Sequence, residues 1–178
     1  RFAGISLMGG GVGIGNVTPA AEFNLWADPE AAQMVLAAGV PLTMIGLNLT
    51  HQVRMGPAEA ERLRRAGTAT SVMVADILEF YSSSTRSALG AGGAAIHDPC
   101  AVLHVTHPGL IETITRPVAV ETTGQLTRGM TVVDERLQPR SPDDPTVGPY
   151  NPHVDVAYGI DVDRAIELII DAAVAPLT

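Results

Sequence analysis

The sequence contains no lysine, a single cysteine and no long apolar run, and each absence excludes a class of function. Without lysine, the chain offers neither a Schiff-base nucleophile nor the lysine of a phosphate-binding P-loop. The lone Cys100 excludes an intrachain disulfide framework and a cysteine-cluster metal site, and it fits a reduced, cytoplasmic setting. No run of about 18 apolar residues occurs, so we predict no membrane-spanning helix. We also expect no signal peptide, because the first residues pass from an apolar strand into a glycine turn.

The chain is acidic and has an ordinary globular composition. Its net charge is −8 without any basic block, which argues against nucleic acid and against anionic membranes as partners. With 178 residues, 46% of them hydrophobic, it is long enough for one domain with a core. We therefore predict a single domain over residues 1–178. Because Arg1 leads at once into an apolar strand, we expect this domain to be the C-terminal portion of a longer fold.

Short apolar runs alternate with segments of helical pattern along the chain. Strands are predicted over residues 2–8, 42–50, 113–122, 130–135 and 153–158. Helices are predicted over residues 29–38, 57–66, 70–89, 99–105 and 161–175, with a one-turn helix that starts at Pro19. Residues 90–95 and 139–152 are predicted loops. This order predicts an α/β fold with an open, Rossmann-like, mostly parallel sheet, flanking helices and a late β-hairpin.

A run of glycines, residues 9–15, follows the first predicted strand. No register of the run gives the GxGxxG pattern of dinucleotide-binding folds, so a nucleotide-binding α/β domain is disfavoured. The run instead allows the backbone to approach a ligand closely at the carboxyl end of a strand, which is where open α/β sheets bind ligands.

Three polar residues, Asn16, Glu22 and Asn24, follow this run within nine residues. Each asparagine taken alone is equally compatible with a turn residue. Glu22 stands among alanines and a phenylalanine, where a buried carboxylate is costly unless it is satisfied. The three together suit recognition of vicinal hydroxyls, because they donate and accept hydrogen bonds at once. The short helix from Pro19 places Asn24 in the connection to the next helix.

A second polar group, His97 and Asp98, stands at a predicted helix start. Asp98 before Pro99 has the pattern of a helix N-cap, and Asp28 before a proline has the same pattern. His97 is compatible with a surface loop or with a general acid. The remaining histidines show no metal-ligand spacing and are interpreted as structural or surface residues: His51, His104, His107 and His153.

Five motifs together resemble the nucleoside hydrolase family, the inosine-uridine preferring nucleoside N-ribohydrolases. In chain order they are GNVTPAAEFN, DPEAA, LTMIGLNLTHQ, HDPCAV and ETTGQLTRGMTVVD. The resemblance runs over nearly the whole chain, and its first and fourth motifs are specific. It implies calcium-dependent hydrolysis of the N-glycosidic bond of ribonucleosides to ribose and free base, in purine or pyrimidine salvage. The transition state of such a reaction is oxocarbenium-like.

The resemblance assigns roles on the sugar side of the site. Asn16, Glu22 and Asn24 match positions that hold the ribose hydroxyls. Met8 and Phe23 match positions that line the sugar pocket.

The resemblance also assigns roles on the base side. Asp98 matches a carboxylate ligand of Ca²⁺, and His97 matches a general acid toward the leaving base. Tyr81 and Thr85 lie in the region that contacts the base. A general acid helps a base that leaves poorly, so His97 favours purine acceptance, although the sequence leaves purine and pyrimidine both open.

One part of the family pattern is missing from this chain. The N-terminal aspartate cluster, which supplies most calcium carboxylates and the base that activates water, is absent. Calcium takes about six to eight oxygens, so Asp98 alone does not make a site. We therefore expect the chain by itself to be inactive and to need the N-terminal half of the fold as a partner. The resemblance also implies a homo-oligomer, either dimer or tetramer. The alternative is a non-catalytic truncated remnant that binds ribosides or serves as an assembly module.

Overall fold

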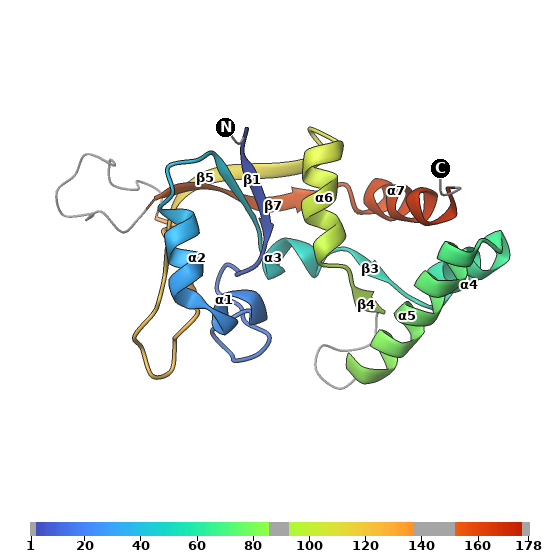
Figure 1. Ribbon diagram of the computed structural model, residues 1–178, viewed down its shortest axis with the longest axis horizontal. Coiled ribbons are helices and arrows are strands. Elements are labelled where there is room, and N and C mark those ends of the chain that lie inside the picture. Colours follow the sequence, from blue (N-terminus) through green and yellow to red (C-terminus); the bar gives the residue numbers. More distant parts are fainter. Residues whose placement is uncertain (1–2, 86–92, 137–151, 176–178) are drawn as a thin grey trace.

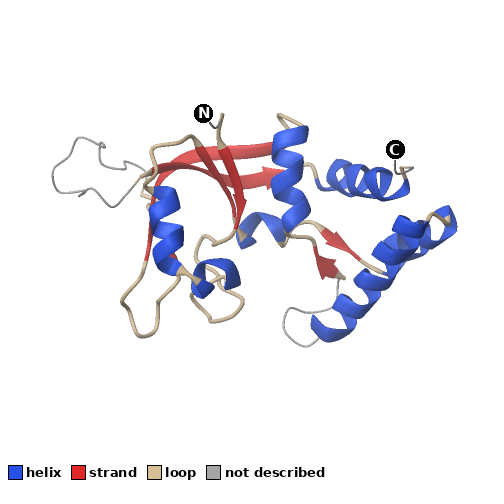
Figure 2. Ribbon diagram, viewed as in Figure 1, coloured by secondary structure: helices blue, strands red, loops and turns tan. Residues whose placement is uncertain are grey.

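The computed structural model describes residues 3–85, 93–136 and 152–175, with only the helical backbone of residues 83–85. The strands in these residues are β1 (Ile5–Met8), β2 (Leu42–Ile45), β3 (Arg54–Met55), β4 (Ala94–Ala95), β5 (Ile111–Val120), β6 (Thr131–Val133) and β7 (His153–Ile160). The helices are α1 (Phe23–Ala27), α2 (Pro29–Leu36), α3 (Leu47–Thr50), α4 (Pro57–Ala66), α5 (Ala69–Thr85), α6 (Asp98–Thr106) and α7 (Val162–Val174). Figure 2 shows how the two kinds of element alternate.

The main sheet has five strands in the order β1-β2-β7-β5-β6 and is strongly curved (Figure 1). β1 and β2 are parallel, as are β2 and β7. β5 is antiparallel to both of its neighbours, β7 and β6. Four strands therefore run in one direction and β5 alone opposes them. The predicted α/β class, the mostly parallel sheet with flanking helices and the late hairpin are confirmed. β3 and β4 form a separate antiparallel pair.

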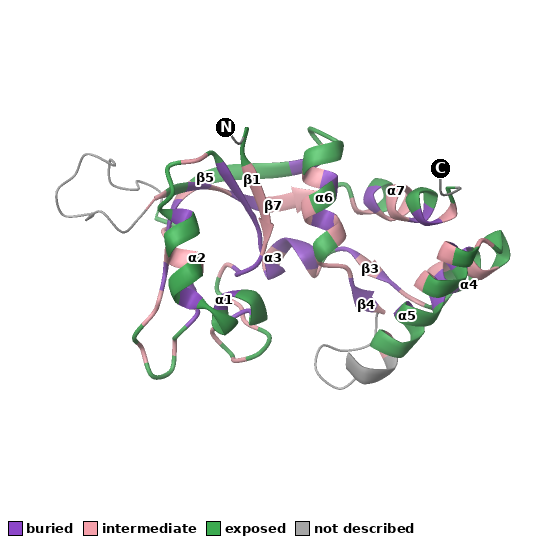
Figure 3. Ribbon diagram, in the orientation of Figure 1, coloured by how far each residue is buried: buried purple, intermediate pink, exposed green. Residues whose placement is uncertain are grey.

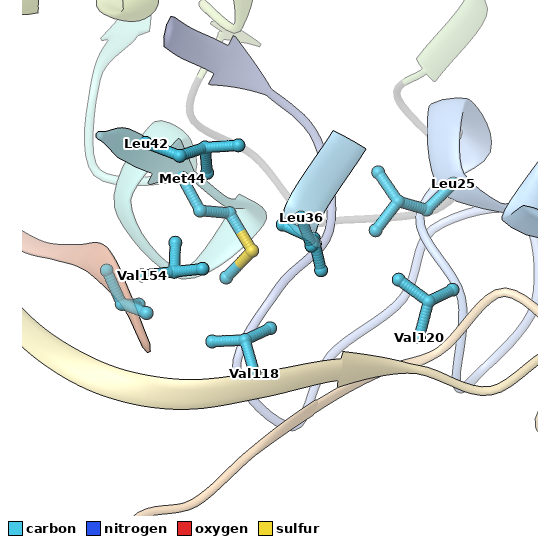
Figure 4. Close-up of a cluster of buried hydrophobic side chains, with 8 residues drawn as sticks. Leu25, Leu36, Leu42, Met44, Val118, Val120 and Val154 are labelled. Atoms are coloured by element: carbon cyan, nitrogen blue, oxygen red, sulfur yellow. The ribbon is translucent and has the colours of Figure 1, made fainter. Parts of the chain in front are cut away.

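Helices cover both faces of this sheet. On one face, Leu25 of α1 and Leu36 of α2 pack on Leu42 and Met44 of β2 and on side chains of β5 and β7 (Figure 4). On the other face, residues of α3, α6 and α7 pack around Ile45. Alternate residues of β2 point to opposite faces. All four of its residues are consequently buried, which explains its nearly continuous apolar sequence.

A third apolar cluster lies away from the sheet, where α4, α5 and α7 meet around β3 and β4. Leu63 of α4 and Ala75 of α5 are fully buried in it. The helix pair α4–α5 thereby projects from the sheet in Figure 1 and is anchored through the small β3–β4 pair. This cluster determines where α5 stands relative to the start of α6.

The predicted strand over residues 42–50 is half wrong, because β2 ends at Ile45. Gly46 is the N-cap of α3, and its carbonyl oxygen accepts hydrogen bonds from the backbone N–H groups of Leu49 and Thr50 at 3.0 Å each. Continuous apolar sequence fits a buried strand and a buried helical turn equally well, so periodicity does not separate them. The helical turn has a consequence for the site, because it places Thr50 and His51.

The helix predicted to start at Pro19 is also wrong. The Thr18 hydroxyl oxygen accepts hydrogen bonds from the N–H groups of Ala20 (3.2 Å) and Ala21 (2.9 Å), which makes a local turn in place of a helix cap. The helix begins four residues later, at Phe23 of α1. Asn24 therefore lies in the first turn of a helix and not in a connection.

The other predicted helices and strands are present, with ends that differ by a few residues. Ala94 and Ala95, expected in a loop, form β4. Residues 90–92 of that loop, residues 86–89 of the helix predicted over 70–89 and most of the loop predicted over 139–152 lie outside the described residues. Among the helices that the structure describes, none combines the length and the apolar character that a bilayer crossing needs.

Candidate active site

The first group of predicted site residues lies on one segment, residues 8–24, which we call the glycine loop. It runs from the end of β1 to the first turn of α1. Glu22 is buried, with 3% of its surface exposed. Its carboxylate accepts hydrogen bonds from the backbone N–H groups of Gly10 (3.0 Å), Asn24 (2.9 Å) and Leu25 (3.3 Å). These bonds satisfy the buried charge. They use three of about four acceptor positions on the carboxylate, which leaves room for one further donor.

The two asparagines of the glycine loop are exposed, and each uses one end of its amide to hold the backbone. Asn16 Oδ1 accepts a hydrogen bond from the N–H of Phe23 at 2.9 Å. Asn24 Nδ2 donates to the carbonyl oxygen of Met8 at 3.2 Å and lies 3.5 Å from the Met8 sulfur. Within the described residues, Asn16 Nδ2 and Asn24 Oδ1 make no hydrogen bond. One donor and one acceptor therefore remain for a ligand that carries hydroxyl groups.

The glycine loop is anchored by two elements that are distant from it in the sequence. The N–H of Gly11 donates to Thr131 Oγ1 at 2.9 Å, and the Thr131 hydroxyl donates to the Gly11 carbonyl at 2.5 Å. The N–H of Leu47, at the start of α3, donates to the Gly10 carbonyl at 2.9 Å. The late hairpin and α3 thus hold the glycine loop from two sides. The only sequence signal for this role is a threonine within the strand predicted over residues 130–135.

His97 stands immediately before α6 and contacts the end of α3. Its Nδ1 lies 2.8 Å from Oγ1 of Thr50, and its ring lies edge-on to the ring of His51 with centroids 5.7 Å apart. Burial lowers the pKa of His97, and the neighbouring His51 lowers it further, while Asp98 opposes the shift. Burial also lowers the pKa of His51, helped by Arg54. Both imidazoles therefore favour the neutral form at neutral pH. His51, interpreted from the sequence as a structural or surface residue, therefore contacts a predicted site residue, and no spacing in the sequence indicates this contact.

Asp98 is not the helix cap that the sequence predicted. His97 occupies the N-cap position of α6 and makes no side-chain cap bond, whereas the cap at Asp28 accepts a hydrogen bond from the N–H of Ala31 at 2.9 Å. The reason is that α6 begins one residue earlier than expected, since the N–H of Cys100 already bonds to the His97 carbonyl at 3.0 Å. The Asp98 carboxylate is exposed and makes no hydrogen bond with any residue that the structure describes.

An exposed carboxylate without hydrogen bonds is a suitable oxygen ligand for a hard cation such as Ca²⁺. The described residues nevertheless contain no group of three or more His, Cys, Asp or Glu side chains placed to hold a metal ion. Calcium takes about six to eight oxygens. Asp98 therefore fits as a single ligand, and the described part of the chain does not complete a calcium site.

Tyr81 of α5 is brought to the same place as His97 and Asp98. The three residues line a cavity of about 330 Å³ whose other lining residues are mostly apolar and come from α5, α7 and the β3–β4 pair. This volume lies at the lower end of small-molecule sites, which span about 300–1,000 Å³. A flat apolar ring with a few polar groups suits such a lining. We call this place the base-side group: Thr50, Tyr81, His97, Asp98 and the cavity.

The glycine loop and the base-side group lie at the same edge of the sheet, the edge to which β1 points. In Figure 1, α1 and the lower end of α6, where that helix starts, both lie near the tip of β1. The short helix α3 connects them, because Leu47 at its start bonds to the glycine loop and Thr50 at its end bonds to His97. α3 is almost wholly buried, whereas α1 is largely exposed (Figure 3). The predicted residues thus form two groups joined by a buried connector.

Comparison with known proteins gives a consistent result. The family model described as inosine-uridine preferring nucleoside hydrolase matches residues 1–167. The pyrimidine-specific ribonucleoside hydrolase RihA of Klebsiella pneumoniae is 45% identical over 135 residues, which are 75% of this chain and 43% of that protein. The purine-preferring ribonucleoside hydrolase from Gardnerella vaginalis superposes with a TM-score of 0.79 at 33% identity, over 95% of this chain and 51% of that one.

A plant nucleoside hydrolase superposes with a TM-score of 0.81 at 29% identity, over 94% of this chain and 52% of that one. The chain therefore spans about half the length of the relatives that it matches.

Proposed function

The chain belongs to the inosine-uridine preferring nucleoside hydrolase family, and we propose that it carries the ribose-binding and base-side residues of an enzyme that hydrolyses the N-glycosidic bond of ribonucleosides. The observation that carries the proposal is the arrangement at one sheet edge. Free amide groups of Asn16 and Asn24 lie on the glycine loop, and His97 and Asp98 lie across α3 beside a mostly apolar cavity. A nucleoside has two parts that match these groups, a ribose ring that carries hydroxyls and a flat base.

On the sugar side, Asn16 donates to and Asn24 accepts from the ribose hydroxyls, and the open acceptor position of Glu22 receives one more. Each amide is already held at its other end by a backbone bond, so the free end is oriented before the sugar binds. Met8 and Phe23 form the wall of the sugar pocket. Hydrogen bonds to ribose hydroxyls that strengthen as the oxocarbenium ion develops favour the transition state over the substrate.

On the base side, His97 takes the acid role toward the leaving base, and in its neutral form it does so as a hydrogen-bond donor. A hydrogen bond from its ring nitrogen to the base stabilises the negative charge that develops there as the C1′–N bond breaks. Water adds to C1′, so the products are ribose and the free base. Tyr81 contacts the base within the cavity. The lining of the cavity is mostly apolar, so its chemistry suits purine and pyrimidine rings equally.

We further propose that Asp98 is one ligand of a calcium ion whose other oxygens come from the N-terminal half of the fold. Its exposed carboxylate, without hydrogen bonds among the described residues, supports this assignment. When bound, such an ion supplies positive charge near the ribose hydroxyls and the attacking water. The described part of the chain lacks the remaining ligands, and we propose that the chain alone is inactive.

The test measures release of free base from uridine and inosine, and of nitrophenol from p-nitrophenyl riboside. It compares the chain alone with the chain joined to, or mixed with, a segment that supplies the family's aspartate cluster. Activity that needs this segment, disappears with a calcium chelator and returns with added calcium supports the proposal. The Asp98→Ala variant should bind calcium more weakly, and unchanged calcium affinity would remove Asp98 from the ligand set.

The second candidate function is a non-catalytic remnant that binds ribosides. It is favoured by one observation, the lack of a complete metal-ligand group among the described residues. A folded chain that binds ribose in a calorimetric titration, yet releases no base when the aspartate segment and calcium are present, would support the remnant and contradict the enzyme.

A further inference from the structure

Thr50 is a fully buried polar residue at the last position of α3, and its hydroxyl contacts the ring nitrogen Nδ1 of His97 at 2.8 Å. We propose that Thr50 is a positioning residue that holds His97 as the tautomer with its proton on Nε2, so that this nitrogen is the hydrogen-bond donor offered to the leaving base. The inference rests on the proposed function for its role in hydrolysis, but its structural part is testable without activity.

The tautomer follows from the hydrogen-bond partners of Thr50. Within the described residues, the Thr50 hydroxyl has one hydrogen-bond partner, His97 Nδ1. The usual alternative acceptor for a helical threonine is the carbonyl one turn back. That carbonyl, at Gly46, already accepts the backbone N–H groups of Leu49 and Thr50.

Two arrangements of the proton are then possible. If Nδ1 carried the proton and donated it to Oγ1, the hydroxyl hydrogen of Thr50 would be buried without an acceptor, which is unfavourable. If the hydroxyl donates to Nδ1, both the hydroxyl hydrogen of Thr50 and Nδ1 of His97 are satisfied. A neutral imidazole that accepts at Nδ1 carries its proton on Nε2.

The ring is also held in orientation. His51 packs edge-on against it, with an angle of 64° between the ring planes. Thr50 in turn is fixed by α3, whose first residue Leu47 bonds to Gly10 of the glycine loop. The position of the His97 donor is therefore coupled through α3 to the segment that carries Asn16 and Asn24. A shift of α3 would move the donor relative to the sugar.

The first arm of the test observes the tautomer by nitrogen NMR of the histidine-labelled chain at neutral pH, with the His97 signals assigned by their loss in His97→Gln. Protonated and unprotonated ring nitrogens of a neutral imidazole are well separated in such spectra. We expect Nδ1 of His97 to be unprotonated in the wild type and in Thr50→Ser, and to become partly protonated in Thr50→Val. The matched control is Thr43→Val, which removes the hydroxyl of another buried threonine, on β2.

A protonated Nδ1 in the wild type, or a tautomer that Thr50→Val leaves unchanged, overturns the proposal. The second arm uses the active assembly with the aspartate segment. There, Thr50→Val should lower kcat about tenfold with little change in KM, as expected for one lost orienting hydrogen bond. Thr50→Ser and Thr43→Val should stay near the wild type. An unchanged kcat in Thr50→Val contradicts the positioning role. An inactive wild-type assembly contradicts the proposed function. In that case the NMR spectra still decide the tautomer of His97.

Discussion

The glycine loop and the base-side group differ in how their polar atoms are held. In the glycine loop, side chains and backbone of one continuous segment satisfy each other, as Glu22 does with three backbone N–H groups. In the base-side group, Thr50, Tyr81, His97 and Asp98 come from distant segments, and apolar packing of α3, α5 and α6 brings them together. The polar side chains of the first group are held by their own segment, and distant elements anchor only its backbone, as at Gly10 and Gly11. The second group is assembled entirely from distant segments.

The same contrast holds for two carboxylates, because Glu22 is buried and Asp98 is exposed. The Glu22 carboxylate accepts hydrogen bonds from three backbone N–H groups, so its removal should lower the stability of the fold. The Asp98 carboxylate is exposed and makes no hydrogen bond with described residues, so its removal should weaken only the binding of a ligand. Variants in the two groups should therefore separate loss of stability from loss of ligand binding or turnover.

The largest effect on stability is expected for Glu22→Ala. Three backbone N–H groups lose their acceptor, and two of them, those of Gly10 and Leu25, are buried. We expect the free energy of unfolding to fall by about 3 kcal/mol. Urea denaturation followed by circular dichroism measures this. Glu61→Ala, which removes only an exposed ion pair with Arg65, is the control and should change little. Equal small losses in both variants would show that Glu22 does not hold the loop.

The next effect concerns turnover at Asn24. In the active assembly, Asn24→Ala should lower kcat/KM about 100-fold, because it removes a hydrogen bond that strengthens in the transition state. Stability should change by less than about 1 kcal/mol, since the amide is exposed. Asn48→Ala is the matched control. The Asn48 side chain bonds to the Val12 N–H and the Ala157 carbonyl, so this variant should lose stability instead. If Asn24→Ala lost stability and turnover equally, Asn24 would be structural. The same comparison applies to Asn16→Ala.

A smaller effect distinguishes the two Asp-Pro pairs. Asp28→Ala removes a helix cap and should lower the free energy of unfolding by about 1 kcal/mol. Asp98→Ala removes no hydrogen bond among the described residues and should leave stability nearly unchanged in the absence of calcium. Thermal denaturation of the two variants side by side measures the difference. If Asp98→Ala lowered the free energy of unfolding as much as Asp28→Ala does, Asp98 would be a helix cap, as its position before Pro99 indicates.

The smallest effect is the pH dependence that His51 adds to the base-side group. An unfolded histidine has a pKa of 6.5, and burial lowers the pKa of His51 in the fold. Between the two values the unfolded state binds the extra proton, so the free energy of unfolding falls as the pH drops below 6.5. Denaturation at pH about 7.5 and about 5.5 should show a smaller drop in His51→Gln than in the wild type. The exposed His107→Gln is the control, and a pH dependence unaffected by His51→Gln would contradict the assignment.

Much of the fold followed from patterns of local sequence. The helix cap at Asp28, the late hairpin and the buried strand β2 were all predicted, because caps, turns and apolar runs act within a few residues. The failures came where local preferences compete. The Thr18 hydroxyl formed a turn in place of a helix cap, and the apolar run after Ile45 turned into α3. Hydrophobic periodicity alone predicts neither of these outcomes.

The sequence by itself determined the α/β class, the family resemblance and the identity of the glycine-loop residues, because these depend on composition and on motifs of neighbouring residues. The tertiary structure decided which atoms of those residues remain free and which are used by the backbone, as at Asn16 and Glu22. It alone placed Thr50 and His51 against His97. Contacts between distant segments depend on how α3, α5 and α6 pack around the sheet, and packing is a property of the whole fold.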